Sequence, residues 1–313
     1  MPIAILTGDP FSWAIERTPA AVAIGVFDGV HRGHQAVLRR LTDRAVAMDG
    51  RSIALTFDPH PLEFLDPSRA PRLLTTIGQR AEVMESCGVE IMGVLPFLQI
   101  RDLDPALFAV EILSLRLNAR WVTVGENFRF GRDRQGDADL LRSVGERQGF
   151  EVDVVSMVGG DSEVISSTRI RALLAAGDVE GAGELLGRRF ELEGPVVHGD
   201  ARGASIGFPT ANLHVPERMA VPANGVYAAF ATVEGTTHPA VVNIGVRPTF
   251  GSNARTVEAH LIGFDSDIYG REVSIAFVAR LREERRFEGP DALVTQISKD
   301  RERAIGILGS ADD

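Results

Sequence analysis

The sequence predicts two domains: a doubly wound α/β domain built on a parallel sheet, followed by a small antiparallel β-barrel with a C-terminal helix. The 313 residues exceed the usual size of one hydrophobic core. In the first half, apolar runs alternate with segments of helical periodicity, which is the pattern of parallel β-α units. From about residue 183, short alternating runs separated by Gly, Pro, Asn and Asp are typical of antiparallel strands.

Five strands are expected in the first half, because strands of a sheet covered on both faces read as near-continuous apolar runs. These runs are 21–27, 52–57, 90–97, 121–125 and 152–158. The first helix is expected to start at Gly33-His34, and it has one apolar face, made by Val37, Leu38, Leu41, Ala45 and Met48. Further helices are expected at 79–87, 105–117, 138–148 and 168–176, and three of them end at a glycine.

The second half predicts a small barrel of short strands. The alternating runs are 190–197, 225–233, 239–244, 256–262 and 272–279. Apolar residues in 290–308 suggest one or two closing helices. We place the boundary at residue 186, which gives domains of 1–186 and 187–313.

Composition limits the function. A formal net charge of −10 argues against nucleic acid as a partner, although a compact site can still bind nucleotide phosphates through backbone N–H groups, local cations and Mg²⁺. The N-terminus lacks a signal-peptide pattern, and no apolar run approaches membrane-spanning length, so we expect a cytoplasmic protein without a membrane partner. Cys87 is the one cysteine, which excludes an intramolecular disulfide. Lys299 is the one lysine, which excludes a Walker A loop and a protein kinase.

The segment Gly25-Val26-Phe27-Asp28-Gly29-Val30-His31-Arg32-Gly33-His34 joins the first expected strand to the first helix. A glycine-rich turn that leads into a helix directs backbone N–H groups at an anion. The imidazoles of His31 and His34 can face a triphosphate and stabilise the charge that develops as pyrophosphate leaves. The alternative is a structural turn with a capping histidine.

A second polar segment, Ile165-Ser166-Ser167-Thr168-Arg169-Ile170-Arg171, opens a later helix. Its three hydroxyl groups can be N-caps and nothing more. Two arginines in the next turn exceed the needs of a cap, and together with the hydroxyls they suit the outer phosphates of a nucleotide.

These two segments together resemble the adenylyltransferase domain of bacterial bifunctional riboflavin kinase/FMN adenylyltransferases, also called FAD synthetases. Thr56-Phe57-Asp58-Pro59-His60-Pro61 and Gly125-Glu126-Asn127-Phe128-Arg129-Phe130-Gly131 agree with the resemblance. It implies a nucleotidyltransferase-like fold for the first domain. Among the residues it implies for ATP and phosphate binding are Gly25, Phe27, Asp28, Gly33, Asn127, Ser166, Ser167 and Thr168. Many members of the family have aspartate where Asn127 stands.

The second half resembles the riboflavin kinase domain of the same family. Gly207-Phe208-Pro209-Thr210-Ala211-Asn212-Leu213 looks like the flavokinase signature, and a glycine-containing loop, 197–203, precedes it. Asn224-Gly225-Val226-Tyr227, the 242–251 segment with Asn243-Ile244-Gly245, Val257-Glu258-Ala259 and Asp267-x-Tyr269-Gly270 complete the resemblance. It implies that Gly207, Pro209, Thr210 and Asn212 bind ATP, and that the Thr210 hydroxyl and the Asn212 amide oxygen help to hold Mg²⁺.

The resemblance implies phosphorylation of riboflavin to FMN and adenylylation of FMN to FAD, with ATP as co-substrate and ADP and pyrophosphate as products. It assigns Glu258 as the catalytic base of the kinase, and we expect His31, His34 and Arg169 to act in adenylyl transfer. Two alternatives remain. One is another adenylyl- or cytidylyltransferase, which the β-rich second half disfavours. The other is a nucleotide- or flavin-binding regulator that has lost one or both activities.

Overall fold

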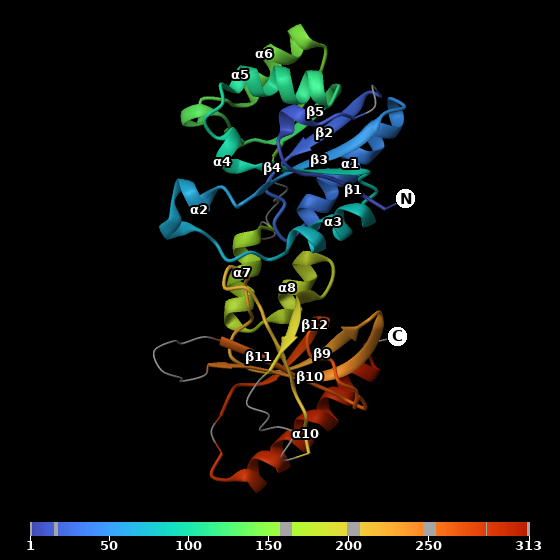
Figure 1. The fold of residues 1–313 in the computed structure, drawn as a ribbon, viewed down its shortest axis with the longest axis vertical. Helices are drawn as coiled ribbons and strands as arrows, with labels where there is room; N and C mark the ends of the chain where they lie inside the picture. The colour runs from blue at the N-terminus through green and yellow to red at the C-terminus, as the bar shows by residue number, and fades with distance from the viewer. Residues whose placement is uncertain are drawn as a thin grey trace. The chain divides into compact units, whose positions relative to one another are not determined.

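The computed structural model describes residues 2–15, 18–156, 165–198, 207–246, 255–285 and 287–311. The chain divides into two compact units, Met1–Ser167 and Thr168–Asp313 (Figure 1). The boundary that the sequence placed at residue 186 stays a prediction for the functional domains. Parts of three motifs lie outside the described residues: the end of the strand expected at 152–158, residues 199–203 of the glycine-containing loop, and residues 247–251.

The first unit is built on a parallel sheet of six strands, in the order β1-β4-β3-β2-β5-β6. The strands are β1 (Ala4–Leu6), β2 (Ala20–Ile24), β3 (Arg51–Asp58), β4 (Ile91–Pro96), β5 (Ala119–Gly125) and β6 (Glu151–Val155). The expected parallel sheet is confirmed. The short edge strand β1 was not predicted from the sequence.

The chain reverses its direction of travel across the sheet at β2, which lies between β3 and β5. After β2 the chain adds β3 and β4 on one side, and it then returns to add β5 and β6 on the other. In open parallel sheets, ligands bind beyond the carboxyl ends of the strands at such a switch point. The topology therefore predicts a ligand site at the segments that follow Ile24 and Gly125.

Helices cover both faces of this sheet, as a doubly wound fold requires. They are α1 (Arg32–Ala47), α2 (Leu62–Leu65), α3 (Ile77–Ser86), α4 (Phe97–Ile100), α5 (Pro105–Leu107), η3 (Phe108–Arg116) and α6 (Ala138–Gln148), with single turns η1 (Pro10–Ser12), η2 (Pro67–Arg69) and η4 (Arg132–Arg134). The helix expected at 105–117 is present, and most of it, η3, has π-helical hydrogen bonding.

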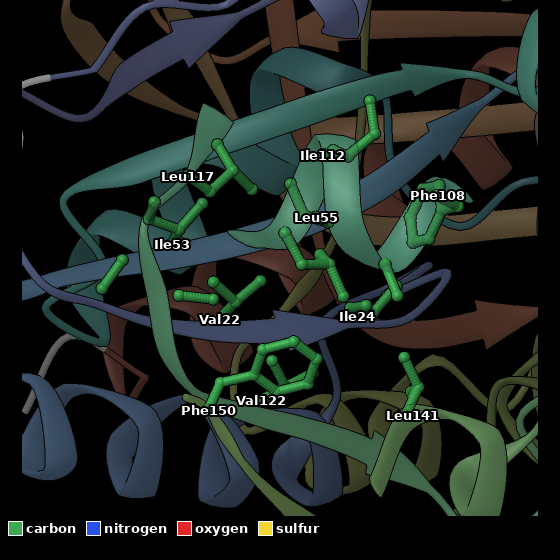
Figure 2. Close-up of a cluster of buried hydrophobic side chains, with 14 of the residues drawn as sticks. Val22, Ile24, Ile53, Leu55, Phe108, Ile112, Leu117, Val122, Leu141 and Phe150 are labelled. Atoms are coloured by element: carbon green, nitrogen blue, oxygen red, sulfur yellow. The ribbon is translucent and has the colours of Figure 1, made fainter. Parts of the chain in front are cut away.

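Alternation along the strands separates two cores. Val22 and Ile24 of β2 point to one face, where they pack with Ile53, Leu55, Phe108, Ile112 and Leu141 (Figure 2). Ala21 and Ala23 point to the other face, toward Leu38 and Leu41 of α1. Small side chains on this second face leave room for α1 to lie close to β2, which fixes where the turn between them sits.

The second unit contains a closed antiparallel barrel in the order β10-β11-β8-β7-β12-β9. Its strands are β7 (Phe190–Val197), β8 (Ala211–Leu213), β9 (Gly225–Val233), β10 (Thr236–Val246), β11 (Arg255–Leu261) and β12 (Glu272–Arg282). The expected barrel is confirmed, while β8 was not expected as a strand. Among the described strands, the closed order leaves no strand at a free end of the sheet.

Helices α7 (Ser167–Ala176), α8 (Val179–Leu186) and α10 (Pro290–Gly309) complete the described helices. The C-terminal segment forms one helix, α10, whose Ala304 and Leu308 pack in a core with Val226, Ala228 and Phe230 of β9. An ion pair between Arg282 of β12 and the buried Asp300 of α10, at 2.8 Å, fastens the helix to the barrel. In the described part of the chain, no helix has both the length and the apolar character needed to cross a membrane.

Candidate phosphate site in the parallel-sheet unit

The turn that follows β2 brings His31 and His34 together. His31 is the N-cap of α1, and its Nδ1 accepts a hydrogen bond from the backbone N–H of His34 at 3.3 Å. The two imidazole rings stack with their centroids 3.7 Å apart and their planes 15° from parallel. The start of α1 and both rings therefore lie at the switch point, where the sequence predicts a phosphate site.

The His34 imidazole is held in its neutral form. Burial lowers its pKa well below the usual value, and the charges of His31 and Arg80 lower that pKa further. A neutral imidazole still carries one N–H, which can donate a hydrogen bond to a phosphate oxygen. The ring also contacts the edge of Phe27, with centroids 5.3 Å apart.

Two glycines make room for these rings. A Cβ at Gly33 would lie 3.2 Å from the His31 ring, and a Cβ at Gly25 would lie 3.1 Å from the Phe27 ring. A side chain at either position would force a ring to shift. Gly25 and Gly33 were expected to bind phosphate, and the structure also gives each of them this local packing role.

The turn between the strand and the helix has a strained backbone. Phe27 has φ of 51° and Val30 has φ of 37°, in a region that non-glycine residues rarely occupy and that is least favourable for a β-branched side chain. Each such residue costs about 1–3 kcal/mol and persists only when surrounding contacts hold it. Strain of this kind is common at functional sites, where it forms part of the arrangement of the site.

Asp28 supplies much of that restraint. Its side chain is 2% exposed, and its carboxylate accepts hydrogen bonds from the backbone N–H groups of Leu74 and Thr75. The carboxylate faces protein donors inside the unit. Its expected contact with phosphate stays a prediction, and its visible role is to fasten the turn to the segment before α3.

The hydroxyl-rich segment reaches the same turn. The Ser167 hydroxyl donates to the backbone carbonyl of Asp28 at 2.9 Å, across 139 positions of sequence. Ser166 beside it is half-buried, and the exposed Thr168 and half-buried Arg169 follow in the first turn of α7. The structure therefore brings Ser167 to the histidine turn, while phosphate binding by Ser166, Thr168 and Arg169 stays a prediction.

Asn127 is exposed in the turn that follows β5. That turn is fixed by hydrogen bonds from Glu126 N to Val155 O at 3.1 Å and from Phe128 N to Gly125 O at 3.0 Å. Because β2 and β5 are parallel neighbours, their carboxyl ends place Asn127 and the histidine turn on one edge of the sheet.

Sequence reasoning missed three residues that support this edge: Thr56, Thr75 and Arg80. Arg80 is 2% exposed, and it donates to the Thr56 hydroxyl at 2.7 Å. The Thr75 hydroxyl accepts from Gly29 N at 3.0 Å. Thr56 lies in the 56–61 motif that agrees with the family resemblance. Arg80 is one arginine on an expected helix, and its sequence neighbours give no signal that it is buried.

Candidate kinase site in the barrel unit

Strand pairing places the proposed base beside two amides. Glu258 of β11 lies opposite Asn212 of β8 on one side and opposite Asn243 of β10 on the other. Directly paired residues of antiparallel strands project to the same face, with Cβ atoms about 4.5–5.5 Å apart. All three residues are half-buried, while the neighbouring Val257 and Ala259 point into the barrel core. The structure thus places Asn212, Glu258 and Asn243 in one polar row across β8, β11 and β10.

A pocket of about 260 Å³ is lined by Ala211 and by Ala259 and Leu261 of β11, which alternate along their strands with Asn212 and Glu258. Asn212, Glu258 and Asn243 themselves do not line it. Pro209, Thr210 and Ala211 line one side of it, and Asp267 and Tyr269 line another. Two motifs separated by more than fifty residues therefore share one cavity. Its volume is close to the lower end of the range of about 300–1,000 Å³ for small-molecule sites.

The Pro209–Thr210 segment is held in place by His260 of β11. The His260 Nδ1 lies 2.9 Å from the Pro209 carbonyl oxygen, and its ring contacts Phe208 edge-on at 5.4 Å. Gly207, just before them, has φ of 85°, which suits glycine. Its predicted contact with ATP is not tested by these contacts.

The polar groups of the row fit a metal-bound nucleotide better than a metal alone. Among the described residues there is no cluster of three or more His, Cys, Asp or Glu side chains that could hold an ion. Thr210 and Asn212 offer neutral oxygen donors two positions apart, with the Glu258 carboxylate opposite Asn212. Neutral oxygens suit a Mg²⁺ ion that takes most of its negative ligands from phosphates.

The fold and the two sites define a two-unit protein that handles phosphorylated nucleotides. Two family models match the chain in chain order: FAD synthetase over residues 14–169 and riboflavin kinase over residues 186–308. The chain belongs to the bacterial bifunctional riboflavin kinase/FMN adenylyltransferase family.

Proteins that carry that name resemble the chain over most of its length. A Pseudomonas fluorescens protein is 41% identical over 91% of this chain and 92% of its own. Proteins from Listeria monocytogenes and Escherichia coli K12 are 37% and 36% identical, over 93% and 92% of this chain and the same shares of their own. A solved structure titled a macrolide-efflux protein from Streptococcus pneumoniae has a TM-score of 0.84 and 30% identity, and the match covers 96% of this chain and 98% of that one.

Proposed function

We propose that this chain makes FAD from riboflavin in two ATP-dependent steps, each carried out by the part of the chain that matches one of the two family models. The barrel unit phosphorylates riboflavin to FMN and releases ADP, and the parallel-sheet unit adenylylates FMN to FAD and releases pyrophosphate. The observation that carries the proposal is that each unit has its own polar site on the residues that match the corresponding family model.

In the kinase step, Glu258 accepts the proton of the ribityl 5′-hydroxyl as that oxygen bonds to the γ-phosphorus of ATP and the bond to ADP breaks. The shared face supports this role, because Asn212 lies opposite the carboxylate and can hold the nucleotide beside it. Gly207 leaves the approach to that segment free of a side chain. Positioning carries most of the catalysis in phosphoryl transfer.

A Mg²⁺ ion that arrives bound to ATP would supply neutralisation of phosphate charge. In the barrel, the Thr210 hydroxyl and the Asn212 amide oxygen would help to hold it.

In the adenylyl step, an FMN phosphate oxygen attacks the α-phosphorus of a second ATP, and the bond to pyrophosphate breaks. The phosphate is already a nucleophile, so no base is required. His31 and His34 donate N–H groups to the triphosphate as charge moves onto the leaving group, and Arg169 adds a cation. Gly25, Phe27, Gly33, Asn127 and the hydroxyls of Ser166, Ser167 and Thr168 shape the surrounding phosphate site.

A chromatographic time course with riboflavin, ATP and Mg²⁺ tests the whole proposal. The purified chain should convert riboflavin to FMN and then FMN to FAD. Accumulation of FMN alone would remove the adenylyl assignment of the histidine turn. Flavin or nucleotide binding without turnover would favour a regulator instead.

A further inference from the structure

A chain of buried contacts connects α3 to the histidine turn. Thr76 caps α3 in a capping box with Gln79, which fixes the first turn of this helix. Arg80 follows immediately, so its side chain is aimed from a fixed helix start toward the carboxyl end of β3. At 2% exposure, the guanidinium is almost wholly removed from water.

Arg80 reaches the turn by two routes. One nitrogen donates to the Thr56 hydroxyl at 2.7 Å, and that hydroxyl donates to the backbone carbonyl of Val26 at 2.7 Å. The other terminal nitrogen lies 3.7 Å from the Asp28 carboxylate, which itself accepts from the segment before α3. The forked guanidinium can serve both routes at once, which an ammonium group cannot do with the same geometry.

These contacts lie on both sides of the strained residues of the turn. Val26 is held on one side of Phe27 and Asp28 on the other, and Thr75 holds the N–H of Gly29 just before Val30. Phe27 and Val30 are the two non-glycine residues of this turn with positive φ, so the hydrogen bonds lie beside the residues whose backbone is strained. The next residue along the chain is His31, the cap of α1.

We propose that Arg80 is a positioning residue for adenylyl transfer: through Thr56 and Asp28 it holds the 26–30 turn in the geometry that presents His31 and His34 to ATP. This inference rests on the proposed function of the first unit. Arg80 does not need to touch the nucleotide, since its effect reaches the reacting groups through the backbone.

Arg80 also acts on His34 through its charge. The charged and titratable groups that act on His34 are His31 from the same turn and Arg80 from α3, whose partner is Asp28. Arg80 and His31 both lower the pKa of His34. Loss of the Arg80 charge should therefore raise that pKa, whereas a change that keeps the charge should not.

Four variants of the full-length chain separate geometry from charge. Arg80→Met removes both the guanidinium donors and the positive charge, and Arg80→Lys keeps the charge but not the two terminal nitrogens. Thr56→Val breaks the route to Val26 and leaves the Arg80–Asp28 pair, while Thr56→Ser keeps the hydroxyl. Arg51→Met is the matched control, because Arg51 pairs with Glu90 at the opposite end of β3.

We expect Arg80→Met, Arg80→Lys and Thr56→Val to lower kcat for FAD formation by about tenfold or more, with KM for ATP and FMN changed much less. Thr56→Ser and Arg51→Met should retain the wild-type kcat. Histidine NMR titration should show a higher His34 pKa in Arg80→Met only. FMN formation by the same samples should be unchanged, and tryptophan fluorescence reports the folding of the first unit, which contains both tryptophans, Trp13 and Trp121.

FAD formation at the wild-type kcat in folded Thr56→Val and Arg80→Lys would overturn the inference. So would a loss that only follows the unfolded fraction. If Arg80→Met fails to fold, the pair Thr56→Val and Thr56→Ser decides the outcome. Failure of the wild-type chain to form FAD would instead refute the proposed function of the first unit.

Discussion

In the first unit the candidate site is a turn, whereas in the second unit it is a row across three strands. The turn places His31 and His34 by buried hydrogen bonds to segments far away in the sequence, and it contains strained residues. The row places Asn212, Glu258 and Asn243 by the register of β8, β11 and β10, without strain at those residues.

The difference shows two ways to position groups for phosphate chemistry. Register is a property of whole strands, so the row shares the stability of the barrel. The turn depends on a few specific contacts, because each unfavourable φ must be held against a cost of about 1–3 kcal/mol. Substitutions near the turn should therefore affect catalysis from a greater distance than substitutions near the row.

The largest expected effect is the loss of both imidazoles from the turn. In His31→Ala/His34→Ala, FAD formation should fall by about 10⁴-fold, because each lost donor to the leaving group costs about 10²-fold or more. FMN formation should stay close to wild type, since it belongs to the other unit. Separate assays with riboflavin and with FMN measure the two steps. Loss of both activities in the folded variant would contradict the assignment of one site to each unit.

The second largest effect is expected from a substitution in the polar row of the barrel. Glu258→Gln keeps the shape of the side chain but removes the base, so FMN formation should fall by about 10²–10³-fold. ATP binding, measured by calorimetry, should change little. Glu272→Gln is a matched control at the exposed start of β12 and should retain full turnover. A wild-type kcat in Glu258→Gln would show that another group accepts the proton.

A smaller effect is expected from the pocket that Thr210 lines. Thr210→Val removes one oxygen donor and keeps the volume, so KM for ATP in FMN formation should rise by about tenfold, the effect of one lost hydrogen bond to a charged ligand. Thr232→Val on β9, whose hydroxyl bonds to Thr237, is the control. Equal KM values for the two variants would argue against a contact between Thr210 and the nucleotide.

The smallest expected effect is on the stability of the first unit, and it depends on the buried His34 of the turn. The pKa of His34 is lowered in the folded state, so the unfolded chain takes up a proton first as the pH falls below about 6.5. The first unit should lose stability from that pH downward, until the pKa of folded His34 is passed, with a slope that approaches about 1.4 kcal/mol per pH unit. Above pH 7 this contribution is fully present.

Urea unfolding followed by tryptophan fluorescence measures this dependence, because Trp13 and Trp121 both lie in the first unit. His34→Gln should remove the part of the slope that His34 causes. An unchanged slope in this variant would show that His34 is not the group responsible.

Much of the fold and part of each site could be predicted from the sequence. The types and order of most elements followed from periodicity, and His31 and His34 stood out because they lie in one short glycine-rich segment between an expected strand and an expected helix. Thr210 and Asn212 came from the resemblance to the riboflavin kinase family. The strands β1 and β8 were missed, because three residues are too few to establish a period. The burial of Arg80 was missed because an arginine on a helix is usually exposed.

The sequence by itself determined the two fold classes and the position of the turn between the first long strand and the first helix, because turns and apolar periodicity depend on neighbouring residues. Only the tertiary structure decided that Arg80 and Thr56 support the histidine turn, that Ser167 reaches Asp28, and that Asn212 lies opposite Glu258. Those contacts join segments separated by 24 to 139 positions, and strand order and register decide which such segments meet.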